Sequence, residues 1–494
     1  MMFFSTRDAE KKPFKASEVI KLGLASDGGL FVPDSVPSLS LDEISELANK
    51  SYPEKAATIL SKFLSDYTYE ELLEDATAAY SPAGFPDGAA PLKKVRDGLF
   101  SLELWRGPTA AFKDMALQIM PRLFVRALRK TGESRDALIL VATSGDTGKA
   151  ALEGYRDVPG TKIQVFYPTD GVSCMQKLQM QTQEGKNVSV KGIRGNFDDA
   201  QNGVKRIFSD AAMAEALDKY GVFLSSANSI NWGRLVPQIV YYVSAYLDMV
   251  KCGDVELGDA IDVCVPTGNF GNIFAAYIAK LMGLPIEKLV CASNVNNVLT
   301  DFLATGTYDR NRSFHATISP SMDILISSNL ERLLFTVAGQ SKTLEYMTSL
   351  NTLGKYTVDA DILAEIQKSF VGIFTGEEET KKTIYNTYKN KNYLIDTHTA
   401  VAMNAAERYI STYEAERKVL VVSTASPYKF ARDVYSSLVS SDIPEDLEAP
   451  AALSDLTGTD IPMPLASLLQ KTILHADTIG KEDMDNAVAD FVKA

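Results

Sequence analysis

The sequence predicts an open α/β fold in which mostly parallel strands alternate with helices that cover both faces of the sheets. Two observations support this prediction. Short apolar runs rich in valine and isoleucine recur along the chain, mostly without an internal charge, which is typical of parallel strands buried on both faces. Helical patterns lie between these runs, so strand, loop and helix follow one another in order. The expected strands are residues 99–104, 137–142, 163–167, 261–265, 289–292 and 419–422, and helices are expected at residues 114–130, 149–155 and 273–282.

The length of the chain indicates more than one domain. At 494 residues it exceeds the size at which a single hydrophobic core normally stops growing, so two or three domains are expected. Residues 81–91 are rich in proline, glycine and alanine, which favours a boundary near this segment. We therefore predict an N-terminal α/β domain at residues 1–95, two nested α/β domains within residues 96–435, and an extension at residues 436–494 that packs over them.

The composition excludes several classes of partner. With 50 basic and 63 acidic residues the formal net charge is -13, which disfavours binding to the phosphate backbone of nucleic acids. The 4 cysteines lack metal-pair spacing and the 3 histidines are far apart, so neither a disulfide framework nor a zinc site is expected. No apolar run is long enough for a signal peptide or a membrane span. The sequence therefore predicts a cytoplasmic protein that acts on small molecules, with no metal, nucleic-acid or membrane partner.

The first loop that could carry chemistry follows the first of these strands. Gly107 and Pro108 end that strand, and Asp114 is suited to the start of the next helix. Lys113 then stands at the helix mouth beside Phe112, where burial and the positive helix end both favour a neutral amine and a lowered pKa. A neutral lysine amine can condense with an aldehyde cofactor. The alternative is a solvated surface lysine, which is the commoner situation for this residue type.

A second loop has the properties of a phosphate cradle. Its glycines allow the backbone to turn several N–H groups inward, and the helix N-terminus behind them adds positive potential. The loop lacks both the Gly-Lys-Ser/Thr ending of a Walker loop and the three glycines of a dinucleotide-binding turn. The alternative is an ordinary glycine-rich turn. The loop follows the strand at residues 261–265 and contains Gly268, Asn269, Phe270, Gly271 and Asn272.

A third loop, after the strand at residues 137–142, is a candidate site for a substrate carboxylate. Small hydroxyl residues such as Ser144 and Thr147, together with two glycines, again expose backbone donors. Asp146 makes this loop a poorer anion site than an amide side chain would. The alternative is an N-cap cluster for the next helix, with Asp146 or Thr147 as the cap, and the two roles are compatible.

A further segment, residues 423–430, follows the last predicted strand. Thr424 could offer its hydroxyl to a ring nitrogen of a cofactor. Serine and threonine at strand ends more often cap turns, so this segment carries little weight by itself.

Seven segments spread along the chain form a joint pattern: residues 4–7, 23–33, 107–114, 228–234, 268–272, 327–332 and 396–401. Together they resemble the fold-type-II pyridoxal-phosphate-dependent enzymes and, within these, the threonine synthase family. The resemblance spans nearly the whole chain and is closer to the fungal and Gram-negative branch than to the plant branch. Two departures are local, because Ser426 stands where many relatives have a histidine and Thr397 stands where a proline is expected.

The resemblance implies the conversion of O-phospho-L-homoserine and water to L-threonine and phosphate. Lys113 is expected to hold pyridoxal 5'-phosphate and, once the substrate amine displaces it, to act as general base. Phe112 is expected to line the ring pocket and Thr424 to face the pyridine nitrogen. The cofactor phosphate is expected to bind to Gly268, Asn269, Phe270, Gly271 and Asn272.

The resemblance also suggests groups that contact the substrate. The loop of Ser144, Asp146 and Thr147 is one candidate, with the two hydroxyls placed at the substrate carboxylate. His398 is expected to be a packed histidine and not a catalyst. The leaving phosphate needs cations or amides, although the two arginines fit structural salt bridges equally well. The candidates for it are Asn228, Arg234, Asn329 and Arg332.

Two other functions stay open at this point. A phospho-amino-acid lyase on the same scaffold would release a 2-keto acid, ammonia and phosphate. The other is a non-catalytic protein that binds phosphate or nucleotide through the Gly268 loop. In such a protein Lys113 and Thr424 would have no function. The sequence does not distinguish a monomer from a homodimer.

Overall fold

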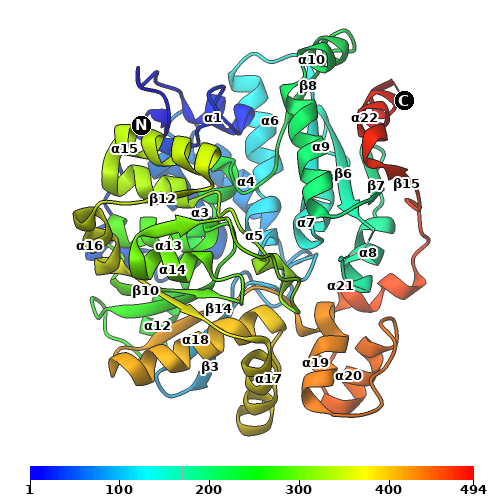
Figure 1. Ribbon diagram of the computed structural model, residues 1–494. Coiled ribbons are helices and arrows are strands. Elements are labelled where there is room, and N and C mark those ends of the chain that lie inside the picture. Colours follow the sequence, from blue (N-terminus) through cyan, green and yellow to red (C-terminus); the bar gives the residue numbers. More distant parts are fainter. Residues whose placement is uncertain (170, 494) are drawn as a thin grey trace.

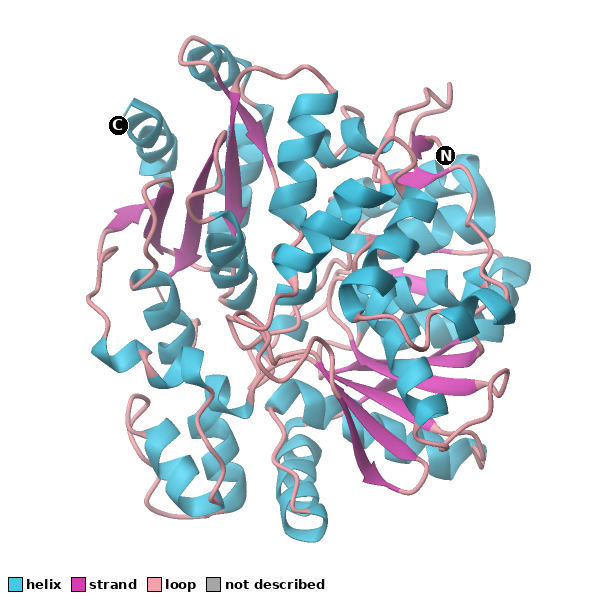
Figure 2. Cartoon of the chain, turned by 180° about the vertical axis from the view of Figure 1, so that it is seen from behind, coloured by secondary structure: helices cyan, strands magenta, loops and turns pink. Residues whose placement is uncertain are grey.

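Two separate sheets with helices packed around them form the body of the chain (Figures 1 and 2). The structure is a computed structural model that describes residues 1–169 and 171–493. The larger sheet has six strands in the order β13 (Phe370–Phe374), β10 (Ile286–Ser293), β9 (Ile261–Pro266), β14 (Val419–Ser423), β4 (Leu99–Glu103) and β3 (Leu92–Arg96). The smaller has five in the order β15 (Thr478–Gly480), β7 (Val188–Arg194), β6 (Thr161–Pro168), β5 (Asp136–Ala142) and β8 (Val222–Ser225).

The predicted α/β class is confirmed. All neighbouring strands in the two sheets are parallel except β3 and β4. Each of the six predicted strands lies in one of these sheets. The strands that the sequence did not predict have weak patterns: β7 contains Lys191 and Gly192, β13 has Gly372 in its centre, and β8 has four residues. They become strands because neighbouring strands pair with them.

The helix predicted for residues 114–130 is divided in two. It consists of α5 (Asp114–Leu117) and α6 (Met120–Lys130), with Pro121 in the first turn of α6. Proline lacks an N–H group and is tolerated in a first turn, so it marks the start of a new helix. The helices predicted for residues 149–155 and 273–282 are present as α7 (Asp146–Tyr155) and α13 (Gly271–Met282).

Further helices cover the sheets and connect them (Figure 1). Those of the central region are α8 (Cys174–Gln181), α9 (Phe197–Ser209), α10 (Ala211–Asp218), α11 (Trp232–Leu235), α12 (Gln238–Lys251), α14 (Val298–Thr305), α15 (Leu330–Leu353), α16 (Ala360–Ser369), α17 (Glu377–Lys391) and α18 (Thr397–Tyr413). A small antiparallel pair, β11 (Thr307–Asp309) and β12 (Lys355–Thr357), lies between them in sequence. Among the described residues, no helix has both the length and the apolar character needed to cross a membrane.

The N-terminal region packs directly onto the central region. It contains the antiparallel pair β1 (Phe3–Ser5) and β2 (Phe31–Pro33), with α1 (Ala16–Leu22), α2 (Leu41–Glu46), α3 (Tyr52–Phe63) and α4 (Tyr69–Ala79). The buried ring of Trp232 lies 5.4 Å from Phe3 and 5.8 Å from Phe63 between ring centroids. The N-terminal region therefore shares a hydrophobic core with the segment around residue 232.

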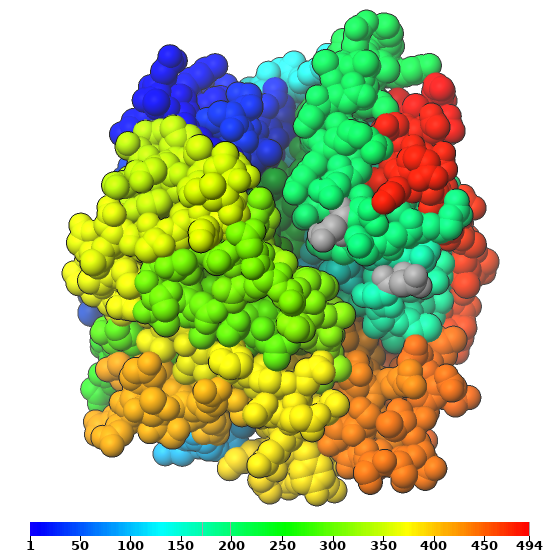
Figure 3. All heavy atoms as spheres, in the orientation of Figure 1, coloured from blue at the N-terminus to red at the C-terminus, as the bar shows by residue number. Residues whose placement is uncertain are grey.

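The C-terminal segment packs over the body of the chain, as predicted. After α19 (Ala431–Leu438) and α20 (Ala449–Thr457), the chain adds β15 in parallel to β7 and ends in α22 (Met484–Lys493), which contacts α9 (Figure 3). Met484 is fully buried and its sulfur lies where a Cβ atom on Gly203 would stand, which explains the glycine there. Strand β3 crosses residue 95 and helix α19 crosses residue 435, and the domain boundaries stay a prediction.

Candidate active site

The loop after β4 carries Lys113 to the start of α5. The Asp114 carboxylate folds this loop back, because it accepts hydrogen bonds from the backbone N–H of Thr109 at 2.8 Å and from its hydroxyl at 2.7 Å. A Cβ atom on Gly107 would lie 2.6 Å from that carboxylate, so glycine is required. Burial raises the pKa of Asp114 to about 6, although the bonds from Thr109 oppose this rise.

A short antiparallel pairing then places Lys113 beside the loop after β14. The N–H of Phe112 donates to the carbonyl of Thr424 at 2.8 Å, and the N–H of Ser426 donates to the carbonyl of Ala110 at 3.1 Å. Lys113 and Thr424 are therefore held in adjacent segments, although they come from opposite ends of the central region. The hydroxyl of Thr424 has no hydrogen-bond partner among the described residues, although the residue is largely buried. This hydroxyl is available to a ligand.

The amine of Lys113 lies in a dry and partly aromatic environment. The residue is 8% exposed and its Nζ atom lies 4.7 Å from the centre of the Phe112 ring. Burial lowers the pKa of Lys113 to about 8, and the charges of Arg234 and Lys429 act in the same direction. The carboxylate of Asp146, with Oδ2 at 3.6 Å from Nζ, opposes this shift. The direction of this shift agrees with the lowered pKa predicted from the sequence, and burial is its main cause. The contact with Asp146 was not predicted.

Asp146 is shared between two lysines. Its Oδ1 atom lies 2.6 Å from Nζ of Lys429 and accepts a hydrogen bond from Gln176 at 2.7 Å, while Oδ2 faces Lys113. Although burial opposes ionisation, the charges of Lys429 and Lys113 keep the pKa of Asp146 below its usual range. A carboxylate already committed to two protein cations repels a substrate carboxylate. We therefore assign Asp146 to the lysines and not to the substrate.

The alternative role of Asp146 or Thr147 as the cap of the next helix is wrong. Helix α7 begins at Asp146 after Gly145, whose φ of 132° is accessible to glycine alone among common residues. The hydroxyl of Thr143 instead accepts hydrogen bonds from the N–H groups of Gly145 at 3.0 Å and Gly148 at 2.9 Å. The N–H groups of Ser144 and Thr147 donate to no acceptor in the described part of the chain, so they remain available to an anion.

The loop after β9 has the geometry of a phosphate cradle. Within the described residues, the N–H groups of Gly268, Asn269, Phe270 and Gly271 have no acceptor, and they precede the N-terminus of α13. Phe270 adopts a left-handed backbone conformation with φ of 61°, which turns the chain into the helix. A Cβ atom on Gly268 would lie 2.6 Å from the carbonyl oxygen of Ser321, so the close cover over this loop requires glycine.

Asn272 completes the cradle with an unpaired donor. Its Oδ1 atom accepts hydrogen bonds from the hydroxyls of Tyr241 at 2.6 Å and Tyr242 at 2.5 Å, which fixes the orientation of the amide. The Nδ2 atom is then buried without a partner in the described part of the structure. A buried amide donor without an acceptor is costly, and a bound phosphate oxygen would satisfy it.

Asn329 and Arg332 brace the cradle from behind. Asn329 donates to the carbonyl of Asn269 from its backbone at 3.1 Å and from its side chain at 2.9 Å. Arg332, which is fully buried, donates to Asn329, to the carbonyl of Phe31 at 3.0 Å and to the carbonyl of Ile230 at 2.6 Å. Because both side chains are engaged by the protein, we assign them to support of the cofactor loop instead of to the substrate phosphate.

Arg234 is a buried cation without a carboxylate partner among the described residues. It donates to the carbonyl of Ala227 at 2.9 Å and to the hydroxyl of Thr147 at 3.3 Å, so it joins two loops. Burial lowers the pKa of Arg234 to about 10, which still leaves it charged at neutral pH. The side chains of Ser144 and Asn228 are half-buried and donate to no acceptor in the described part of the chain. These four residues form a candidate site for a substrate anion, which we call the Arg234 cluster.

His398 is a packed histidine, as predicted. Its Nε2 atom accepts a hydrogen bond from the N–H of Ser321 at 3.1 Å, so the ring proton sits on Nδ1, which lies 2.9 Å from Asp396. The ring also packs on Phe430 at 4.9 Å. His398 thus holds the segment that covers Gly268.

Sequence reasoning missed Lys429, Gln176 and the two tyrosines behind Asn272. Lys429 lies in a segment that had been singled out because it follows a strand, so its position was a usable signal. Nothing in the spacing of Gln176 or of the tyrosines pointed to the site, because only the tertiary fold brings them there.

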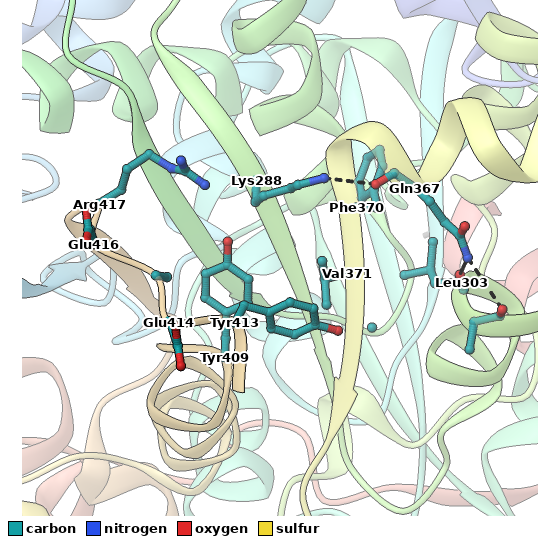
Figure 4. A pocket seen from close by; sticks show the side chains of 13 residues that line it. Lys288, Leu303, Gln367, Phe370, Val371, Tyr409, Tyr413, Glu414, Glu416 and Arg417 are labelled. Atoms are coloured by element: carbon teal, nitrogen blue, oxygen red, sulfur yellow. Dashed lines mark hydrogen bonds between the residues drawn. The ribbon is translucent and has the colours of Figure 1, made fainter. Parts of the chain in front are cut away.

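A cavity of about 590 Å³ lies elsewhere, between the ends of α16 and α18 and strands β10 and β13 (Figure 4). Its two basic side chains are engaged by the protein, since Lys288 donates to the carbonyl of Gln367 and Arg417 donates to Asp262. None of the candidate site residues lines it. We therefore do not identify it with the site.

Comparison with known proteins agrees with this geometry. Three family models match the chain: "Threonine synthase N terminus" at residues 2–80, "Pyridoxal-phosphate dependent enzyme" at residues 90–425 and "Threonine synthase, C-terminal" at residues 399–463. The chain belongs to the threonine synthase family of pyridoxal-phosphate-dependent enzymes.

Individual relatives support this assignment. The chain is 37% identical to threonine synthase of Pseudomonas aeruginosa, with 92% of this chain and 93% of the relative covered. The crystal structure of a threonine synthase from Brucella melitensis with bound PLP matches with a TM-score of 0.87 and 35% identity, over 100% of both chains. The chain is also 42% identical to human threonine synthase-like 1, with 90% of this chain matched, but it covers only 61% of that longer protein.

The residues present fit pyridoxal phosphate. The open N–H groups and the unpaired Asn272 amide can hold its phosphate, Lys113 offers a buried amine for its aldehyde, and Thr424 offers a free hydroxyl for its ring nitrogen. These assignments match the roles predicted from the sequence, and they remain proposals about individual residues.

Lys113→Ala is expected to abolish covalent attachment of the cofactor. Borohydride reduction of the cofactor-loaded wild-type chain should leave a stable adduct on the peptide that contains Lys113, as peptide mass spectrometry would detect. The variant should carry none. An adduct on another lysine of the wild-type chain would contradict the assignment.

Asn272→Leu is expected to weaken cofactor binding by about 10- to 100-fold, because it removes a buried donor to a charged phosphate. Titration with pyridoxal phosphate, followed by fluorescence, gives the Kd. Asn269→Ala is the matched control, since it keeps the backbone N–H that faces the phosphate and removes only an exposed side chain, so its Kd should stay near that of the wild type. Equal losses in both variants would argue against a specific role of the Asn272 amide.

Proposed function

We propose that this chain is a threonine synthase that converts O-phospho-L-homoserine and water to L-threonine and phosphate. The observation that carries the proposal is the presence of two separate sets of unpaired anion-binding groups around one buried lysine. Arg234 acts on the charge of Lys113, and the cradle follows β9, which is separated from the lysine's strand β4 only by the parallel strand β14. The cradle at residues 268–272 suits the phosphate of the cofactor. The Arg234 cluster remains for a substrate that brings anions of its own, and this substrate has a carboxylate and a phosphate.

Lys113 supplies the proton transfers. When bound, pyridoxal phosphate provides an electron sink for the charge left on the substrate carbon after a proton is removed. With a pKa of about 8, the freed amine of Lys113 is partly neutral near physiological pH, so it can accept a proton from Cα. The same amine takes a proton from Cβ as phosphate leaves from Cγ. Protons are then returned to Cγ, which becomes the methyl group, and to Cα, and water adds its hydroxyl at Cβ. Burial of the amine keeps bulk water away from these steps.

Thr424 and the Arg234 cluster set the electrostatics. A hydroxyl at the ring nitrogen carries no charge, so unlike a carboxylate it does not force that nitrogen to be protonated. A weaker electron sink favours elimination and replacement over transamination. Arg234 with Thr147, Ser144 and Asn228 would hold the substrate anions, which orients the substrate against Lys113.

A phospho-amino-acid lyase is the alternative. It would use the same cofactor site and the same lysine but release a 2-keto acid, ammonia and phosphate. The chain is 42% identical to threonine synthase-like 1, whose name states likeness to the synthases and not synthase activity. This relative therefore keeps the lyase function open. Only the products separate the two reactions.

We further propose that the chain works in the cytoplasm, as a monomer or homodimer, on small molecules. The net charge of -13 supports the absence of a nucleic-acid partner.

Incubation of the cofactor-loaded chain with O-phospho-L-homoserine is expected to give threonine and phosphate in equal amounts. Amino-acid analysis and a phosphate assay measure the two products. The Lys113→Ala variant, prepared in the same way, should give neither. Phosphate accompanied by a 2-keto acid and ammonia, without threonine, would assign the chain to the lyases.

Arg234→Met is expected to raise the KM for O-phospho-L-homoserine about tenfold or more, because it removes a charge-assisted hydrogen bond to a substrate anion. The Kd for pyridoxal phosphate should change little. Arg206→Met serves as the control, since Arg206 is exposed and pairs with Asp485 on α22. Parallel changes in KM and in cofactor Kd would instead indicate a general disturbance of the site.

A further inference from the structure

Lys429 has no part in the chemistry described so far, yet it is one of the most deeply buried charged side chains in the molecule. It is 1% exposed and lies in the short turn after β14, at residues 427–430. Its ammonium lies 2.6 Å from Oδ1 of Asp146 and donates to the carbonyl of Thr109 at 3.1 Å. A buried ammonium is tolerated only when it is paired and hydrogen-bonded, and here both conditions are met.

The partners of Lys429 lead directly to Lys113. Asp146 faces Lys429 with one oxygen and Lys113 with the other, at 2.6 Å and 3.6 Å. Thr109, the second partner, belongs to the loop that presents Lys113, and its carbonyl also accepts a hydrogen bond from Gln179 at 3.1 Å. Lys429 therefore contacts both the carboxylate that faces Lys113 and the loop that carries it.

The other charged groups around Lys113 make Asp146 the decisive one. Arg234 from α11 and Lys429 from the turn after β14 are positive, and Asp146 from α7 is the negative group that faces the amine. Asp114, the neighbour of Lys113 in sequence, turns its carboxylate toward Thr109. How closely Lys429 binds Asp146 therefore determines how strongly the negative charge of Asp146 acts on the amine of Lys113.

We propose that Lys429 is a positioning residue that acts on Lys113 through Asp146. The closer contact of Lys429 neutralises and orients the carboxylate, so that Lys113 keeps a negative neighbour without forming a tight ion pair with it. This arrangement leaves the amine free to give up its proton for cofactor attachment and for base chemistry. The inference rests on the proposed role of Lys113 and deepens it.

The proposal requires opposite effects from the two halves of the pair. Lys429→Met leaves Lys113 as the main cation for Asp146, so Lys113 should hold its proton more tightly. Asp146→Asn leaves two ammonium groups without the carboxylate between them, so Lys113 should release its proton more readily. A purely structural role would loosen the site in both variants and would not move the proton affinity in opposite directions.

Competitive labelling of amines measures this property. The full chain, freed of cofactor, is treated with trace acetic anhydride over a pH series, and peptide mass spectrometry gives the labelling rate at Lys113. At pH 7 we expect the rate to fall about tenfold in Lys429→Met, which corresponds to a rise of about one pKa unit. In Asp146→Asn we expect a several-fold rise. The double variant should return close to the wild-type rate, because the two charges are removed together.

Controls separate this effect from damage to the fold. Lys55→Met removes another buried lysine, which lies on α3 in the N-terminal region and donates to Ser244 of α12, and should leave the Lys113 rate unchanged. Near-ultraviolet circular dichroism shows whether each variant is folded. If one single variant does not fold, the other single variant still carries the test, because the direction of its shift is predicted. Shifts of the same sign in both single variants, or no shift in either, would overturn the proposal.

This experiment is independent of the reaction. It uses neither substrate nor cofactor, so a chain that forms a keto acid instead of threonine could still show the opposite shifts. Conversely, threonine formation without these shifts would leave the proposed function standing and remove Lys429 from the account.

Discussion

The site depends on a short backbone pairing between residues 110–112 and 424–426. Two hydrogen bonds join segments more than 300 positions apart in the sequence, and through them the lysine at the end of one strand meets the threonine at the end of another. Strands β4 and β14 are neighbours in the six-stranded sheet, so the pairing extends beyond the sheet a contact that the sheet has already made. Because both strands are buried, the position of Lys113 is fixed by the core and not by a flexible loop.

The charges around that lysine are unbalanced in a way that matches the proposed chemistry. Of three buried cations, Lys113 and Lys429 share the carboxylate of Asp146, and Arg234 has no carboxylate partner among the described residues. An excess of buried positive charge is unfavourable in an empty site and favourable once anions are bound. The open N–H groups of the cradle add to the same bias. The folded site therefore favours the binding of molecules that carry phosphate and carboxylate groups.

The sequence predicted those parts of the fold whose cause is local. The six apolar runs became strands because their burial is encoded in their own residues, and the glycines at 107, 145 and 268 stand where a side chain cannot fit. Strands such as β7 and β13 were not predicted, since their pairing partners, and not their own composition, make them strands. The same distinction holds in the site. Lys113 and the cradle were recognisable from neighbouring residues, whereas Arg332 and Asn329 could not be separated from substrate ligands until their bonds to Phe31 and Asn269 were known.

The strand order of the large sheet has a consequence for how the molecule is made. Strand β14 lies between β4 and β9, yet it is synthesised more than 150 residues after β9. Until it emerges from the ribosome, the β3–β4 hairpin and the β9–β10 pair each present an unpaired edge that no local partner can cover. Pairing between strands so far apart in sequence is slow, and the partly folded intermediates are prone to aggregate. The cofactor pocket can therefore be completed only after β14 has been synthesised, because Thr424 follows this strand.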